Sequence, residues 1–310
     1  MINCMDSTFC IPGVDGLPRT KGLVITRELI KDYGINSKVN NGQTANAEIR
    51  RNRRWTFKLR APLLLKDNIK IAGGLKYFVE EHNFENPETL DNDFYNNLED
   101  RPLRSLRADI FIMKPTRGNK YFILRISGAL NGDFEGIDLG SDYFKFSIAP
   151  LIGWKKSNYL SYAFGIAYSE IFGRRSIYPV VSYNQTFSPH WGVESILPAE
   201  LKFRYNSLDK KNFLYLKAEL NGSNYTLNFF ENRDEPVFLE KSEIRFLFTW
   251  EREIYDFLWF GIEAGFRTNI NFDLSENAQI NAETLVNNQL NEAVVGNISL
   301  FIVPPRKFLK

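Results

Sequence analysis

Apolar and polar residues alternate with a period of two along most of the chain, from about Trp55 to the C-terminus. Segment 143–154 shows the pattern clearly, because one of its faces is apolar and carries Phe144, Phe146, Ile148, Pro150, Ile152 and Trp154. The other face is mostly small or polar and includes Lys145 and Ser147. Since successive residues of a strand point to opposite sides, this alternation predicts a β-strand with two unlike faces.

The same alternation recurs in five further segments, which are 55–60, 106–112, 122–130, 244–250 and 258–268. In each of them, Lys, Arg, Asp or Glu occurs on the face opposite the apolar one. Helical periodicity is nearly absent, so the chain is predicted to be all-β.

The predicted strands are joined by connections of two alternating kinds. The short kind has the polar composition of turns and comprises 66–68, 116–119, 155–158, 188–190, 208–211 and 255–256. The longer kind comprises 80–102, 131–141, 221–240 and 273–293. Short turns at one end and long loops at the other are typical of the β-barrels of bacterial outer membranes.

The number of predicted strands depends on how segment 191–205 divides. It forms two short strands if Leu197, Pro198 and Ala199 make a tight turn. Single-chain bacterial barrels have an even number of strands, so we predict a transmembrane, antiparallel up-and-down β-barrel of about 14 strands, with about 12 as the alternative. The barrel is expected over residues 21–303, with an N-terminal tail at 1–20 and a C-terminal tail at 304–310.

Aromatic residues gather near the ends of the predicted strands, several of them beside the short turns. Aromatic residues favour strands in any β protein, but this position favours an aromatic girdle at a membrane interface. The residues predicted for this girdle are Trp55, Trp154, Trp191, Tyr205, Trp250, Tyr255 and Trp259.

Composition excludes several other classes of protein. The 310 residues include 39 Lys and Arg against 37 Asp and Glu, without a basic cluster of the kind that binds nucleic acid. No apolar run approaches the roughly 18 residues that a membrane helix needs. The mean hydropathy of −0.30 is compatible with a barrel, because lipid-facing and lumen-facing residues average out.

The first residues bear on export and on redox state. Residues 1–19 lack a basic start followed by an apolar stretch, so we expect that a secretory signal was removed or that the chain begins internally. Cys4 and Cys10 are the only cysteines, and either a small disulfide loop or two free thiols fits them. Four zinc ligands are not close in sequence, so no metal site is expected.

Several segments together resemble a family of uncharacterised outer-membrane β-barrels that is common in Bacteroidota. They are 191–199, 201–205, 219–225 and 298–303, and the resemblance covers about Gly22 to Val303. It implies a barrel fold in a bacterial outer membrane and no established activity.

The sequence contains no clear set of catalytic residues. A nucleophile and its base need hydrogen-bond contact, but His82 and His190 fall in loops at opposite ends of the predicted barrel and are expected to be solvated. Inward carboxylates are expected to pair with arginines, for example Glu243 with Arg245 and Glu263 with Arg267. The acidic loop 80–100 lacks the ordered spacing of a calcium loop. We therefore expect no enzyme, no catalytic residue, no cofactor and no metal.

The inward faces of the predicted strands carry more basic than acidic residues. A charge facing lipid at mid-membrane costs about 2–4 kcal/mol, so these residues belong in the lumen. The lumen-facing candidates are Lys58, Arg60, Lys76, Arg107, Asp109, Arg125, Lys145, Lys217, Glu219, Arg245, Glu263 and Arg267. A water-filled lumen of this composition would favour anions, whereas in a plugged lumen the charges would form closed networks.

These observations predict a porin-like outer-membrane barrel that acts as a small passive channel with a net basic lumen. The first alternative is a non-conducting accessory or structural subunit of a larger envelope complex. The second is a soluble, lipocalin-like barrel whose apolar faces surround a ligand. The expected partners are outer-membrane lipid and other envelope proteins, and no nucleic acid.

Overall fold

The computed structural model describes residues 13–85, 87, 94–116, 118–136, 140–228, 235–277 and 282–306. Cys4 and Cys10 lie outside these residues, so the structure does not address their redox state. Within the described ranges, no helix is long and apolar enough to cross a membrane.

Strands dominate the described chain. They are β1 (Leu23–Val39), β2 (Thr44–Lys66), β3 (Ile69–Glu85), β4 (Leu103–Pro115), β5 (Lys120–Gly132), β6 (Phe144–Ser157), β7 (Leu160–Ser169), β8 (Ser176–Thr186), β9 (Trp191–Leu197), β10 (Glu200–Asn206), β11 (Asn212–Leu227), β12 (Val237–Tyr255), β13 (Leu258–Ser275), β14 (Thr284–Leu290) and β15 (Ala293–Ile302). The short helix α1 (Phe94–Asp100) and the 3-10 turn η1 (Ser141–Tyr143) complete the elements.

The last two strand segments form one interrupted strand. β15 pairs with the first part of β1, where Leu23 lies opposite Ile302. β14 continues the same register along β1, where Ile35 lies opposite Leu290. The described segments therefore make 14 strands, each antiparallel to its neighbours in sequence, and the last one pairs with β1 to close the sheet. The predicted 14-stranded up-and-down barrel is confirmed.

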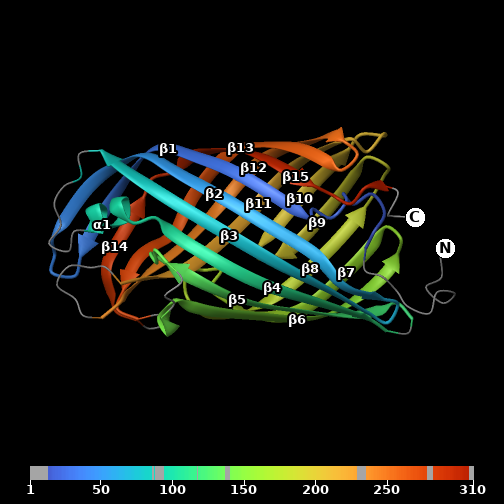
Figure 1. Ribbon diagram of the computed structural model, residues 1–310, viewed down its shortest axis with the longest axis horizontal. Helices are drawn as coiled ribbons and strands as arrows, with labels where there is room; N and C mark the ends of the chain where they lie inside the picture. Colours follow the sequence, from blue (N-terminus) through green and yellow to red (C-terminus); the bar gives the residue numbers. More distant parts are fainter. Residues whose placement is uncertain are drawn as a thin grey trace.

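The two ends of the barrel differ as the sequence predicts. All six predicted short connections separate consecutive strands, from the 66–69 turn to the 255–258 turn, at what we call the short-turn end. Both ends of the described chain lie at this end, where Asp15 contacts Asn158 and Arg306 contacts Asp256, whereas α1 and β14 lie at the opposite, long-loop end (Figure 1).

The strands reach further into the long-loop end than the alternation indicates. β3 continues to Glu85, β11 to Leu227 and β13 to Ser275, and β12 begins at Val237, so much of the predicted loops 80–102, 221–240 and 273–293 is strand. In β12, residues 239–243 are buried on both faces, so no alternation of apolar and polar residues marks this part.

Large apolar side chains face outward around the barrel. Those exposed on the strands include Leu59, Leu75, Ile110, Phe146, Ile152, Phe164, Leu216, Phe246, Phe248, Phe266 and Ile298. Soluble proteins rarely expose an apolar surface of such extent. A lipocalin-like interior would place these side chains inside, so the expectation that the apolar faces surround a ligand is wrong.

The barrel wall is lower along β9 and β10, whose seven residues each contrast with the 16 of β11. Above them, β11 pairs directly with β5 through Thr226 and Gly132. The β7–β8 loop approaches β11 so closely that a Cβ on Gly222 would lie 2.0 Å from the carbonyl oxygen of Ile171. Glycine is therefore required at position 222. These two contacts across the low wall make the long-loop half of the barrel narrower than the short-turn half.

Replacing an outward apolar residue by arginine tests the outer face. Phe248→Arg places a charge on the apolar exterior of β12, where Phe248 is 49% exposed. We expect it to lower the free energy of unfolding in phospholipid vesicles by about 2–4 kcal/mol if this position lies near mid-membrane. Leu208→Arg, in the β10–β11 turn, is the control, since Leu208 is 78% exposed. Equal effects in urea titrations would contradict a lipid-facing exterior.

Candidate functional site

An apolar plug fills the lumen at the long-loop end. Helix α1 contributes the buried side chains of Phe94, Tyr95 and Leu98 to a cluster with residues of the surrounding strands. The ring centroids of Phe84 and Tyr95 lie 5.2 Å apart, and those of Phe94 and Phe272 lie 6.4 Å apart. The Tyr95 hydroxyl donates a hydrogen bond to Ser37 Oγ at 2.8 Å. Apolar side chains are therefore packed inside the barrel at that end.

A buried ion-pair network lies beneath the plug, inside the part of the wall that runs from β12 through β1 to β3. Arg54 on β2 contacts Glu28 on β1 at 3.0 Å, Glu80 on β3 at 2.9 Å and Glu243 on β12 at 2.8 Å. Arg245, also on β12, contacts the other oxygen of Glu28 at 2.8 Å. Because β1, β15 and β13 separate β2 from β12 in the wall, the contact of Arg54 with Glu243 joins non-neighbouring strands through the lumen.

Three further groups complete this network. Lys241 pairs with the second oxygen of Glu80, and His82 Nε2 lies 3.3 Å from the first. Arg267 lies 3.6 Å from Glu243 and 4.1 Å above the ring of Tyr33. Charges buried to this degree are stable only when each has its partners. We call these residues, with Glu28, Arg54, Glu80, Glu243 and Arg245, the ion network.

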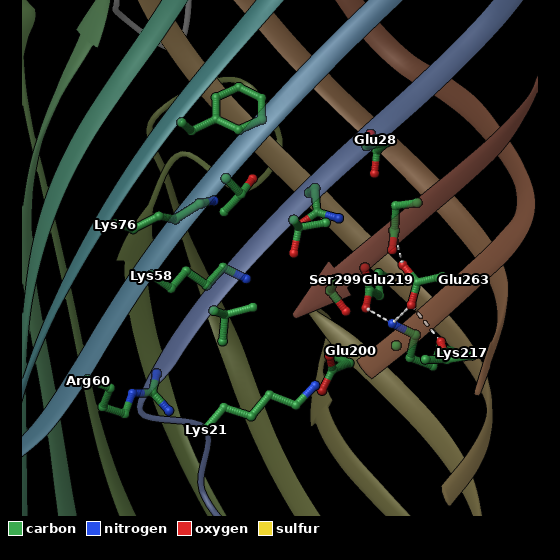
Figure 2. A pocket seen from close by; sticks show the side chains of 18 of the residues that line it. Lys21, Glu28, Lys58, Arg60, Lys76, Glu200, Lys217, Glu219, Glu263 and Ser299 are labelled. Carbon is green, nitrogen blue, oxygen red and sulfur yellow. Dashed lines mark hydrogen bonds and ion pairs between the residues drawn. The ribbon is translucent and has the colours of Figure 1, made fainter. Parts of the chain in front are cut away.

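A cavity of about 700 Å³ occupies the lumen between the ion network and the short-turn end. Its described lining holds 12 Lys and Arg residues against eight Asp and Glu residues. Figure 2 shows the charges on two walls, with Lys58, Arg60 and Lys76 on one side and a group around Lys217 on the other. Lys217 pairs with Glu219 at 3.0 Å and also with Glu263.

The short-turn end of the cavity is narrowed by the N-terminal segment 13–22. Its backbone contacts the barrel rim through Asp15 N and Asn158 O at 2.7 Å and through Gly16 O and Asn206 Nδ2 at 2.9 Å. Arg19 pairs with Glu253 at 3.2 Å and with Asp256 at 3.1 Å. The segment therefore follows the rim from the β6–β7 turn to the β12–β13 turn.

Most of the predicted lumen-facing residues line the cavity. Ten of the 12 do so: Lys58, Arg60, Lys76, Arg107, Asp109, Arg125, Lys217, Glu219, Arg245 and Glu263. The other two are buried elsewhere, since Lys145 contacts Thr226 at 3.1 Å and Arg267 belongs to the ion network. Glu243 pairs with Arg245 as predicted, whereas Glu263 pairs with Lys217 instead of Arg267.

The predicted aromatic girdle is placed only in part. Four of its residues lie at or near the short-turn ends of their strands, namely Trp154, Trp191, Tyr205 and Tyr255. Of these, Trp191 is 43% exposed. Trp55 and Trp250 lie further along their strands, and both are partly exposed. Trp259 is 3% exposed and packs on Phe213 and Phe301 in an inward cluster, so its predicted interface position is wrong. The alternation explains this, because Trp259 shares its face with Gly261 and Glu263.

The sequence reasoning missed the centre of the ion network. Glu80 and His82 were expected in a loop, but both lie on β3 and are buried, so the prediction of a solvated His82 is wrong. Arg54 lies on the same face of β2 as Lys58 and Arg60. Continuing the alternation from Lys58 through Thr56 would have placed Arg54 in the lumen as well. His190 does lie in a turn, where its Nδ1 is 2.8 Å from Asn206 O and its ring stacks on Tyr205.

Among the residues that the structure describes, no group of three or more His, Cys, Asp or Glu side chains could hold a metal ion. Glu88, Asp91 and Asp93 of the acidic loop lie outside those residues.

Residues 90–300 match the model of a protein family described as a domain of unknown function, DUF6268. The chain belongs to this family. No curated protein matches the sequence.

Among solved structures, the chain is similar to the toluene transporter TodX of P. putida, with 8% identity, coverage of 94% of this chain and 91% of that one, and a TM-score of 0.42. An outer-membrane channel of Pseudomonas putida F1 shows 9% identity, coverage of 95% and 98%, and a TM-score of 0.39. The translocator domain of the autotransporter NalP from Neisseria meningitidis shows 10% identity, coverage of 93% and 90%, and a TM-score of 0.36.

Removing the central arginine of the ion network tests its role in stability. We expect Arg54→Met to lower the free energy of unfolding by about 3–5 kcal/mol, because buried carboxylates lose their partner. Arg125→Met is the control, since the Arg125 side chain is 50% exposed and its one ion pair within the described residues is with Asp109. Such an exposed pair contributes about 0–1 kcal/mol. Similar losses for both variants in urea titrations would contradict a structural role for the network.

Proposed function

We propose that this protein is an outer-membrane channel for small, water-soluble anions and that the conformation described is its closed state. The observation that carries the proposal is the cavity, which lies inside a closed barrel and has 12 basic and eight acidic residues in its described lining.

The outer-membrane location is supported by the two faces of the wall. Only helices and closed barrels satisfy all their backbone hydrogen bonds in lipid, and this barrel is closed with apolar side chains outside. Charged side chains gather inside, where they meet partners or the cavity. A source in Bacteroidota stays a prediction from the sequence resemblance.

Selectivity for anions is supported by the excess of positive charge in the lumen. A confined cavity with low-dielectric walls strengthens the potential of its lining charges, so it concentrates counter-ions. Rings of Arg and Lys have this role in anion pores. The net basic lumen expected from the sequence is therefore part of this proposal.

The closed state is supported by the plug. Apolar side chains of α1 and of the strands fill the long-loop end, and the ion network extends into the lumen beneath them. An apolar constriction prevents conduction because water and ions do not enter it. Conduction requires that α1 leave the lumen, and the ion network below it must then admit water.

A non-conducting accessory barrel is the second candidate function. The observation that favours it is the same plug, since a permanently filled lumen transports nothing. The two functions differ in what happens when the plug is weakened.

Conductance of a plug variant separates them. Phe94→Asp with Leu98→Asp places two charges among buried apolar residues, which disfavours the position of α1 in the lumen. In planar bilayers we expect the conductance to rise about tenfold or more over that of the wild type, with a reversal potential of the sign for anions in a salt gradient.

Asn96→Asp is the matched control, because Asn96 lies exposed on the same helix. A heat-dependent shift in gel mobility confirms that each variant has folded. Folded variants that stay non-conducting would overturn the channel and favour the accessory barrel. A reversal potential of the opposite sign would overturn anion selectivity.

A further inference from the structure

The charges around the cavity are not evenly paired. Each of the eight acidic residues in its described lining has a basic partner within 4.0 Å. Among the 12 basic residues, four form no ion pair within the described part of the chain, namely Lys58, Arg60, Lys76 and Arg107. The unpaired charge of the cavity is therefore entirely positive.

Three of these residues form a row across adjacent strands. Lys58 on β2 lies directly opposite Lys76 on β3, and Lys76 lies directly opposite Arg107 on β4. Arg60 is two residues from Lys58 on the same face of β2. Figure 2 shows Lys58, Arg60 and Lys76 on one wall, with their side chains directed into the cavity. We call Lys58, Lys76 and Arg107 the basic row.

Such a row is unfavourable unless something neutralises it. Like charges directly opposite each other destabilise a sheet, and burial strengthens their repulsion. Asp109, the nearest acid along β4, is held by Arg125 at 2.8 Å. On the opposite wall Glu219 is held by Lys217 at 3.0 Å. No protein carboxylate is left in the described cavity lining to compensate the row.

We propose that the basic row is a binding site for a small anion that carries a phosphate group. Neighbouring strands lie about 4.8 Å apart, so the three long side chains can converge on one group of this size. The guanidinium of Arg107 matches a phosphate with two parallel hydrogen bonds, and the ammonium groups of Lys58 and Lys76 add charge. Two or more negative charges on the ligand suit three unpaired cations better than a monovalent anion does.

The phosphate site extends the proposed channel function. It rests on that function because the ligand must be able to enter the lumen. The phosphate can belong to a dissolved solute or to a lipid headgroup, because the row recognises the same chemistry in both. Binding itself does not require conduction, so the two proposals can fail separately.

Calorimetric titration of the full chain in detergent tests the site, with inorganic phosphate and pyrophosphate as probes in about 150 mM NaCl to screen diffuse attraction. We expect saturable binding by the wild type and about tenfold or greater weakening in Lys58→Met with Lys76→Met. Lys21→Met with Lys202→Met is the control. It removes the same charge from the cavity lining, but both residues are paired, with Glu251 and Glu200.

A stability measurement gives a second readout that does not depend on affinity. Without phosphate, Lys76→Met should raise the urea midpoint of unfolding, because it removes the central like charge of the row. Pyrophosphate should raise the midpoint of the wild type and leave that of Lys58→Met with Lys76→Met unchanged, since a ligand stabilises only the state that binds it.

The outcomes distinguish the sources of the ligand and the two proposals. Binding of the free probes supports a solute, and phospholipid that copurifies with the wild type but not with Lys58→Met and Lys76→Met supports a headgroup. Absence of both, or equal weakening in the two double variants, would overturn the site and leave the channel intact. Phosphate binding by a protein whose plug variant never conducts would retain the site and overturn the channel.

Discussion

The closed, alternating wall is the constraint on which the rest of the structure depends. Each strand places every second side chain in a lumen that has no exit through the sheet, and the outward positions are taken by apolar residues. Charged residues are therefore confined together, and each must find a partner or water. The ion network, the charged cavity and the basic row are three results of this confinement.

The narrowing of the barrel determines where along its axis the lumen is packed with side chains and where a cavity remains. Where β11 meets β5 above the short strands β9 and β10, the lumen is small enough for α1 and the surrounding strands to fill. Just below, Arg54 on β2 reaches the carboxylates of Glu28 on neighbouring β1 and of Glu243 on the more distant β12. In the wider half a cavity remains, and within the described residues Lys58 and Lys76 form no ion pair, because the acids that line it are held by other basic residues.

The sequence predicted the barrel, its strand number and ten of 12 lumen-facing candidates, because regular strands carry an uninterrupted alternation. It failed where that alternation changes phase. In β1 the inward positions shift from Glu28 and Ile30 to Tyr33 and Ile35 at Asp32, whose φ is 53°. β2 has an irregularity between Ile49 and Arg51. No local pattern could show that Arg54 and Glu243, 189 residues apart, meet inside the lumen.

Spin labels along β12 would test most directly that the wall separates lipid from a confined lumen. Single cysteines replace residues 244–250 in turn in a chain with Cys4→Ser and Cys10→Ser, reconstituted in phospholipid vesicles. The structure predicts high oxygen accessibility at Phe246, Phe248 and Trp250, and low oxygen accessibility at Arg245, Leu247 and Thr249, with the polar nickel reagent reaching Thr249 in the cavity. High oxygen accessibility at Arg245, Leu247 and Thr249 instead, or access of the nickel reagent at every position, would contradict the membrane barrel.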